Sequence, residues 1–215
     1  PVSIPGQPET ALVSMGIYVF NAAFLYEQLI RDHQINDSSH DFGKDLIPYL
    51  VPRYRVFAHR FLNSCVNMAS GIPYWRDVGT VDAYWEANLD LITITPQLNL
   101  YDEDWPIWTH QEQLPPAKFV FDDVDRRGQA LDSSVSGGCI ISGATVRGSL
   151  LFSNVKVNSY SNVQDSVILP NVVVGRHARL RRVVVEKQCI IPEGLEVGYD
   201  SEADRKRFYV TAKGI

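Results

Sequence analysis

The stretch VSGGCIISGATVRGSLLFSNVKVNSYSNVQDSVILPNVVVGRHARLRRVVVEKQCIIPEGLEV, residues 135–197, is periodic. Glycine, serine and asparagine cluster between apolar residues that recur every five or six positions, at Val135, Ile141, Val146, Phe152, Val157, Val163, Leu169, Val174, Leu180, Val185, Ile191 and Val197. This imperfect hexapeptide repeat is typical of a parallel β-helix, in which each coil has three short faces and one inward aliphatic side chain per face. In the alternative fold, an antiparallel sandwich, turns usually recur every ~8–12 residues. The period therefore predicts a β-helix.

The chain on either side of the repeat bounds this domain. Residues 200–215 (DSEADRKRFYVTAKGI) are expected to close the last coil with a short helix. Residues 96–116 contain four prolines and no sustained period, and an irregular segment of that length indicates an interdomain connection. We therefore expect a first domain over residues 1–95, a linker over 96–116, and a β-helix domain over 117–215.

Two helices are predicted in the first half of the chain. Asn21 is expected to cap the first, over residues 22–31, because an N-cap side chain accepts a hydrogen bond from a first-turn amide that has no other partner. A pair of serines introduces the second helix, over residues 41–50. Pro48 should distort or stop this second helix, because proline lacks the amide that continues the hydrogen-bond ladder.

Two strands are predicted beside these helices. Residues 13–20 (VSMGIYVF) have the β-branched and aromatic content of a buried strand, and residues 55–62 (RVFAHRFL) alternate between apolar and polar. Strands that alternate with helices indicate an α/β layer architecture. Two strands do not make a stable sheet alone, so the first 95 residues are interpreted as the edge of a larger sheet.

A third helix is predicted within YWRDVGTVDAYWEANLDLI, residues 74–92. Thr80 is the expected N-cap, and an apolar stripe follows it at helical spacing, at Val81, Trp85, Leu89 and Ile92. Asp77 lies just ahead of the cap, where the amides and the dipole of a helix favour negative charge. The aromatic and glycine residues packed around Asp77 favour a functional role over a purely structural one.

Four motifs along the chain carry a resemblance: LVSMGIYVFN (residues 12–21), SSHDFGKDLIP (38–48), YWRDVGT (74–80) and LPPAKFV (114–120). In this order they resemble bacterial ADP-glucose pyrophosphorylases, also called glucose-1-phosphate adenylyltransferases, over nearly the whole chain. The resemblance implies the C-terminal part of a Rossmann-like nucleotidyltransferase domain, then a left-handed parallel β-helix. The family begins with a nucleotide-binding half that carries a GGxGxRLxPLT-type loop. That loop is not found here, so we expect a C-terminal fragment.

The resemblance also implies a site for glucose 1-phosphate, made by Ser14, Tyr18, Asp41, Phe42, Trp75 and Asp77. Hydroxyls and a carboxylate can bind sugar hydroxyls, and aromatic rings can pack on the apolar face of the sugar. Asp77 is further implied to be the catalytic residue and one ligand of Mg²⁺, opposite an aspartate of the missing half. One carboxylate binds Mg²⁺ poorly, so the fragment is not expected to hold the metal tightly. The family's phosphate-binding lysine would lie just before Pro1.

The intact enzyme implied by the resemblance converts ATP and glucose 1-phosphate to ADP-glucose and pyrophosphate in glycogen biosynthesis. The fragment alone is expected to be inactive. Relatives are homotetramers that sugar phosphates and AMP control allosterically. Lys187 aligns with an arginine that contacts the AMP phosphate in relatives, and a lysine there keeps the charge but loses the bidentate geometry.

Composition excludes several other classes of protein. The net charge is −5, so no basic field favours nucleic acid or an anionic membrane. No apolar run approaches the ~20 residues of a membrane-spanning helix. Three widely spaced cysteines, Cys65, Cys139 and Cys189, with no CxxC motif argue against a disulfide framework or a zinc site, and suit the cytoplasm.

Two other functions remain open at this point. Many β-helix proteins are acyltransferases with a histidine base, for which His177, in GRHARLRR, is the candidate within the repeat. The arginines around it form a solvated turn or an anion site, and the backbone amides of residues 136–138 (SGG) could bind a small anion. Alternatively, the β-helix is a purely regulatory or assembly module. His40, beside Asp41, is interpreted as a loop residue.

Overall fold

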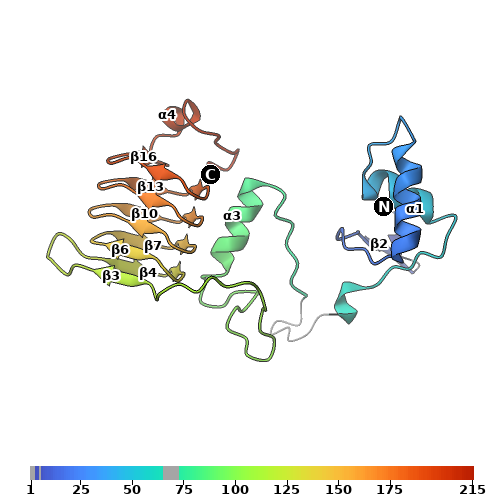
Figure 1. The fold of residues 1–215 in the computed structure, drawn as a ribbon, viewed down its shortest axis with the longest axis horizontal. Helices are drawn as coiled ribbons and strands as arrows, with labels where there is room; N and C mark the ends of the chain where they lie inside the picture. The colour runs from blue at the N-terminus through green and yellow to red at the C-terminus, as the bar shows by residue number, and fades with distance from the viewer. Residues whose placement is uncertain (1–2, 5, 65–72) are drawn as a thin grey trace. The chain divides into compact units, whose positions relative to one another are not determined.

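The fold is given by a computed structural model that describes residues 3–4, 6–64 and 73–215 (Figure 1). The chain divides into two compact units, Pro1–Arg60 and Phe61–Ile215. The predicted division at residues 96–116 stays a prediction, although residues 91–117 hold no helix or strand. Cys65 lies outside the described residues, while Cys139 and Cys189 are free thiols.

The second unit contains the predicted left-handed parallel β-helix. Its short strands form three parallel sheets, one per face of the coil. The first sheet contains β4 (Gln129–Leu131), β7 (Thr145–Arg147), β10 (Asn162–Gln164), β13 (Arg179–Arg181) and β16 (Glu196–Val197). The second contains β5 (Ser134–Val135), β8 (Leu150–Leu151), β11 (Val167–Ile168) and β14 (Val184–Val185). The third contains β3 (Lys118–Val120), β6 (Ile140–Ser142), β9 (Lys156–Val157), β12 (Val173–Val174) and β15 (Ile190–Ile191).

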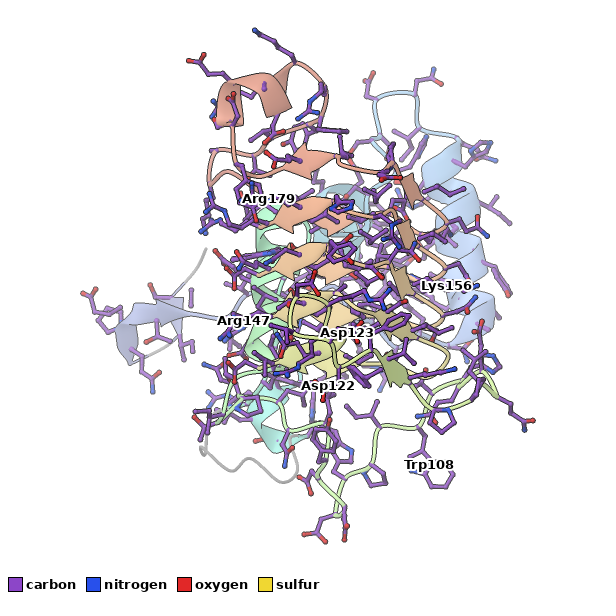
Figure 2. The ribbon with its side chains drawn as sticks, turned by 90° about the vertical axis from the view of Figure 1, so that its left-hand side faces the viewer. Trp108, Asp122, Asp123, Arg147, Lys156 and Arg179 are labelled. Atoms are coloured by element: carbon purple, nitrogen blue, oxygen red, sulfur yellow. The ribbon has the colours of Figure 1, made fainter. Side chains whose placement is uncertain are left out.

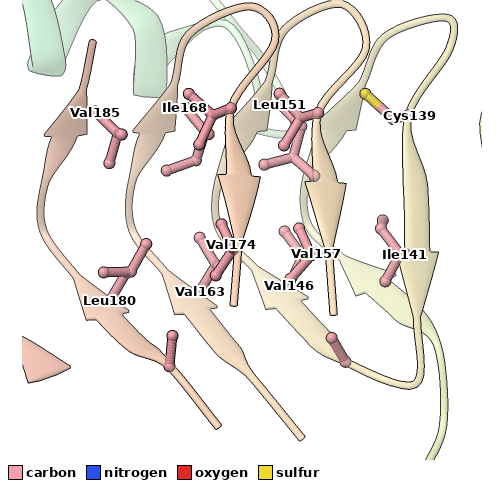
Figure 3. Close-up of a cluster of buried hydrophobic side chains, with 14 residues drawn as sticks. Cys139, Ile141, Val146, Leu151, Val157, Val163, Ile168, Val174, Leu180 and Val185 are labelled. Carbon is pink, nitrogen blue, oxygen red and sulfur yellow. The ribbon is translucent and has the colours of Figure 1, made fainter. Parts of the chain in front are cut away.

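Stacked aliphatic side chains fill the inside of the coils (Figure 3). Val146, Val163 and Leu180 are paired in register on neighbouring strands, and each is at most 1% exposed. Charged side chains such as Arg147 and Arg179 cover the outside (Figure 2). Burial of the apolar column, at about 25 cal/mol per Å², is what holds the solenoid together.

The phase of this column differs from the prediction at two positions. Phe152 and Leu169 were expected to point inward, but they are half-buried, and the preceding residues Leu151 and Ile168 fill the core at no more than 1% exposure. At each of these two places the sequence has two adjacent apolar residues, so the spacing of five or six residues is satisfied whichever of the two points inward. The parallel ladder selects Leu151 and Ile168, because they pair with one another and Ile168 pairs with Val185 on the next coil.

Helix α3 (Val81–Asp90) lies along the side of the coils (Figure 1). Its predicted N-cap is confirmed, since the Thr80 hydroxyl accepts from the amide of Ala83 at 3.1 Å. The indole N–H of Trp85 donates to the carbonyl of Asp165 at 2.7 Å, and the guanidinium of Arg182 lies 5.2 Å from the indole ring. These contacts attach α3 to the turns of the second sheet.

The C-terminal segment also contacts α3. After α4 (Ser201–Arg205), the predicted closing helix, the chain returns so that the Thr211 hydroxyl donates to Asp82 at 2.6 Å. The Lys213 ammonium pairs with Glu86 at 2.5 Å, which raises the pKa of Lys213. We call the contacts of Trp85, Thr211 and Lys213 the α3 clasp.

Replacing Trp85 by phenylalanine is expected to lower the free energy of unfolding of the second unit by about 1–2 kcal/mol. The change removes one hydrogen bond and weakens a cation–π contact, each of which contributes about 1 kcal/mol. Urea denaturation followed by circular dichroism measures the loss. Trp108→Phe is the matched control, since Trp108 is 90% exposed, and an equal loss in both variants would contradict the role of the clasp.

The first unit is smaller. β1 (Ser3–Ile4) and β2 (Gln7–Ala11) form an antiparallel pair, followed by α1 (Ala22–His33) with the predicted Asn21 cap. The second predicted helix is present as a π-helical turn, η1 (Phe42–Leu46), and a short α2 (Ile47–Leu50). The change of helix type one residue before Pro48 agrees with the expected distortion.

Both strands predicted before residue 65 are wrong. Residues 13–20 are irregular, with Val13, Ile17 and Val19 at least 74% exposed, and residues 55–60 are irregular up to the 3₁₀ turn η2 (Phe61–Asn63). A strand needs a neighbour for its backbone amides and carbonyls. Within the described residues no strand pairs with either segment. No helix in the described part of the chain is long and apolar enough to cross a membrane.

Candidate functional site

A cavity of about 710 Å³ opens in the first unit, between the segment before α1 and the loop that enters η1. It is lined by Ser14, Gly16, Tyr18, Phe20, Leu25, His40, Asp41, Phe42 and Gly43. Four of the six residues predicted to bind glucose 1-phosphate, Ser14, Tyr18, Asp41 and Phe42, therefore share one cavity.

Two hydroxyls lie together on one wall. Ser14 Oγ is 3.0 Å from the Tyr18 hydroxyl, and it also accepts from the amide of Gly16 at 3.2 Å. Gly16 has φ +73, a left-handed conformation that turns the chain so that residues 14 and 18 face each other. A pair of neighbouring hydroxyls can both donate to and accept from a sugar hydroxyl.

Aromatic rings also line the cavity. Tyr18 stacks on Phe42 with ring centroids 5.7 Å apart and an interplanar angle of 15°, and Phe20 packs against both rings. Phe42 is 37% exposed, so part of its ring is open to a ligand. Such a surface can pack on the apolar face of a sugar ring.

Asp41 is the N-cap of η1, whereas a preceding serine was expected to introduce this helix. Its Oδ1 accepts from the amides of Gly43 and Lys44 at 2.7 and 2.8 Å. Both bonds use the same oxygen, and Asp41 is exposed. The second oxygen, Oδ2, can therefore bind a ligand hydroxyl while the loop stays fixed.

A histidine–aspartate pair stands at the edge of the cavity. His40 Nδ1 lies 2.9 Å from Asp32 Oδ2, and the Ser38 hydroxyl donates to the same carboxylate at 3.0 Å. The side chain of Asp32 is 8% exposed, whereas that of His40 is 52% exposed. The hydrogen bond from His40, helped by the one from Ser38, lowers the pKa of Asp32 against the opposing effect of burial.

The sequence did not reveal this pair. His40 was interpreted as a loop residue, and its partner lies eight positions earlier, near the end of α1. The intervening DHQINDSSH segment has no period that predicts how its ends meet. The only signal available was that His40 adjoins Asp41.

Acidification is expected to remove the stabilisation that Asp32 gives to α1. The folded pKa of Asp32 lies below the ordinary value of 3.8, so the contribution is fully present above pH ~4 and is lost as the pH falls through the folded pKa. Amide exchange of α1 is measured in wild type and Asp32→Asn, which lacks the carboxylate. The difference in α1 protection between wild type and Asp32→Asn should shrink below pH ~4. The difference between wild type and the exposed control Asp37→Asn should not change with pH. A difference that persists at pH ~2 would contradict the assignment.

Trp75 and Asp77, the other two predicted site residues, belong to the second unit. Asp77 is exposed, and its Oδ1 accepts from the amide of Gly79 at 3.0 Å in the turn that leads into α3. Trp75 is 43% exposed. The described residues contain no cluster of three potential metal ligands, so Asp77 can offer a metal one carboxylate only.

Three arginines in the basic turns of the β-helix already bond to other groups of the protein. Arg179 pairs with Glu196 at 2.7 Å, Arg181 donates to the Gly198 carbonyl, and Arg182 donates to the Lys213 carbonyl. Each of these three guanidiniums is therefore already bonded to one acceptor within the protein, and the choice between a solvated turn and an anion site stays open. Lys187 is exposed on the turn after β14.

Two weaker candidates have structural roles. The His177 ring stacks on Tyr160 with centroids 4.9 Å apart and planes 12° apart, at a left-handed corner of the coil. In the SGG segment, the amides of Ser136 and Gly138 donate to the carbonyls of Leu151 and Pro115, so two of its three amides are not available to an anion.

Comparison with known proteins covers both parts of the chain. Residues 5–93 match the family model described as nucleotidyl transferase, and residues 115–215 match the one described as GlmU-like, C-terminal hexapeptide. The glucose-1-phosphate adenylyltransferase of Nitrosospira multiformis is 78% identical over all 215 residues, and that of Nitrosomonas europaea is 76% identical over 216 aligned positions. The corresponding enzyme of Dechloromonas aromatica is 65% identical over 215 residues.

The chain belongs to the glucose-1-phosphate adenylyltransferase family. It spans about half the length of these relatives: 51%, 50% and 49% of the three adenylyltransferases named above. The two matched family models lie on either side of residues 96–116, the irregular segment. The cavity of the first unit and the Asp77 turn both fall within the part that matches the nucleotidyl transferase model.

Proposed function

We propose that this chain supplies the sugar-phosphate side of an enzyme that transfers the adenylyl group of ATP to glucose 1-phosphate. A phosphate oxygen of glucose 1-phosphate attacks the α-phosphorus of ATP, and pyrophosphate leaves to give ADP-glucose. The observation that carries the proposal is the cavity of the first unit, which is lined by two hydroxyls, a carboxylate and stacked aromatic rings. It occurs in a chain 78% identical to a named adenylyltransferase.

The residues have separate roles in this proposal. Ser14, Tyr18 and Asp41 bind hydroxyls of the glucose, and Phe42 packs against its ring. Trp75 is inferred to contact the glucose on the basis of the family resemblance alone. Because the substrates are two anions, the reaction needs charge neutralisation and in-line positioning more than a covalent nucleophile.

Asp77 fits the role of a ligand for Mg²⁺, because it is an exposed carboxylate with Oδ1 fixed by the amide of Gly79. When bound, Mg²⁺ supplies positive charge to phosphate oxygens. A single carboxylate does not make a tight site, and Mg²⁺ is normally bound by one or two carboxylates together with substrate phosphates. Asp77 would thus act with groups outside this chain.

The remaining expectations concern the whole enzyme. We infer that it operates in glycogen synthesis in the cytoplasm and forms a homotetramer. We also place the control by AMP and sugar phosphates at the β-helix, with Lys187 as one phosphate contact. The exposed position of Lys187 supports this role, as does its charge.

The test joins this chain to the nucleotide-binding half of the Nitrosospira multiformis relative. The chimera should form ADP-glucose from ATP and glucose 1-phosphate, whereas the 215-residue chain alone should not. A chimera that folds but forms no ADP-glucose would overturn the proposed function. Activity of the isolated chain would overturn the assignment of ATP binding to the other half.

A further inference from the structure

His40 combines three properties that a loop residue does not require. Its Nδ1 is bonded to the buried carboxylate of Asp32, which fixes the plane of the ring. Its side chain is 52% exposed and lines the 710 Å³ cavity beside Asp41. Within the described part of the chain, no hydrogen-bond partner is found for its Nε2.

The surroundings of His40 decide what kind of group Nε2 can bind. Asp32 contacts the ring directly, Asp41 is the next residue, and Asp45 acts on His40 through its charge. His33 packs 6.0 Å from the ring, and Arg31 lies 3.9 Å from the Asp32 carboxylate. The carboxylates of Asp32 and Asp45 leave no net positive charge at the ring for a phosphate dianion. A neutral hydrogen-bond donor, such as a sugar hydroxyl, suits this position better.

We propose that His40 is a specificity residue whose Nε2 accepts a hydrogen bond from one hydroxyl of the monosaccharide phosphate in this cavity. Asp32 is the positioning residue, because it accepts the Nδ1 proton and so leaves the Nε2 lone pair on the ligand side. The inference rests on the proposed function and adds one contact to the same site. A site that hydrogen-bonds a hydroxyl discriminates against an analogue that lacks it, because a polar group is then left unpaired.

Two substitutions separate the binding role from a structural one. The amide nitrogen of asparagine can replace Nδ1–H as a donor, and the amide oxygen of glutamine can replace Nε2 as an acceptor. His40→Asn therefore keeps the bond to Asp32 and removes the acceptor for the sugar hydroxyl, whereas His40→Gln does the reverse. Asparagine also tolerates the left-handed backbone of His40, where φ is 57.

The experiment measures kcat/KM of the chimera for glucose 1-phosphate and for its monodeoxy analogues, one for each ring hydroxyl. Wild type should disfavour the analogue that lacks the hydroxyl bound by His40 by about five- to tenfold, which corresponds to one hydrogen bond of about 1 kcal/mol. His40→Asn should lose about the same factor on glucose 1-phosphate, mainly through KM, and should no longer discriminate against that one analogue. His40→Gln should retain the discrimination.

Other outcomes overturn the inference. If His40→Asn discriminates at every hydroxyl as wild type does, His40 does not bind the sugar. If the loss is spread evenly over all analogues, the substitution has damaged the cavity as a whole, and the role is structural. An active wild-type chimera in either case leaves the proposed function standing. An inactive wild-type chimera overturns the proposed function, and this inference with it.

Discussion

Replacing Asp77 by asparagine is expected to lower kcat of the chimeric enzyme about a thousandfold. The change removes the negative charge but keeps an oxygen that can accept from the amide of Gly79, so the turn before α3 stays formed. A metal ion that stabilises charge in the transition state contributes several kcal/mol, and about 4 kcal/mol corresponds to three powers of ten in rate. The loss should appear in kcat, together with a higher Mg²⁺ concentration for half-maximal activity.

The matched control is Asp125→Asn, an exposed aspartate in the same unit, on the loop between β3 and β4. It should leave both quantities unchanged. If Asp77→Asn keeps wild-type kcat at saturating Mg²⁺, Asp77 has neither a catalytic nor a metal-binding role. The proposal for the reaction would then need a different carboxylate.

Replacing Ile168 by alanine is expected to lower the free energy of unfolding of the second unit by about 3 kcal/mol. Ile168 is fully buried between Leu151 and Val185, and deleting its side chain leaves a cavity that the rigid ladder cannot close. Because each coil of a solenoid is stabilised by its neighbours, the damage is felt on both sides. Urea denaturation followed by circular dichroism measures the change.

The adjacent residue provides the control. Leu169→Ala removes a side chain of similar volume from a half-buried position, so a loss of about 1 kcal/mol or less is expected. The pair also tests the phase of the repeat. If Leu169→Ala were the more damaging change, Leu169 and not Ile168 would be the inward residue, as the sequence analysis expected.

The β-helix could be predicted from sequence because its structure repeats. Every coil needs an aliphatic side chain on each face, so the same apolar pattern recurs many times along the sequence. Its phase was ambiguous only where two apolar residues adjoin, as at Leu151 and Phe152, and pairing between coils resolves it. The caps at Asn21 and Thr80 were also predictable, since a cap depends on four consecutive residues.

The first unit was less predictable because its features depend on distant partners. Residues 13–20 have the composition of a strand, but composition does not supply a neighbouring strand. The Asp32–His40 pair joins the end of α1 to the loop before η1, and no local sequence pattern predicts this contact. Family resemblance alone grouped Ser14, Tyr18, Asp41 and Phe42 into one predicted site; the four residues line one cavity, and their role in binding stays a prediction.

The α3 clasp has a consequence for synthesis of the chain on the ribosome. Thr211 and Asp82 are 129 positions apart, and Lys213 and Glu86 are 127 apart. Synthesis proceeds at about 5–20 residues per second, so Thr211 and Lys213 are translated on the order of ten seconds after α3. The coils that carry the Trp85 contact are complete earlier, so attachment of α3 proceeds in two stages. The helix that follows the Asp77 turn therefore gains its last two contacts only after residues 211–213 have been translated.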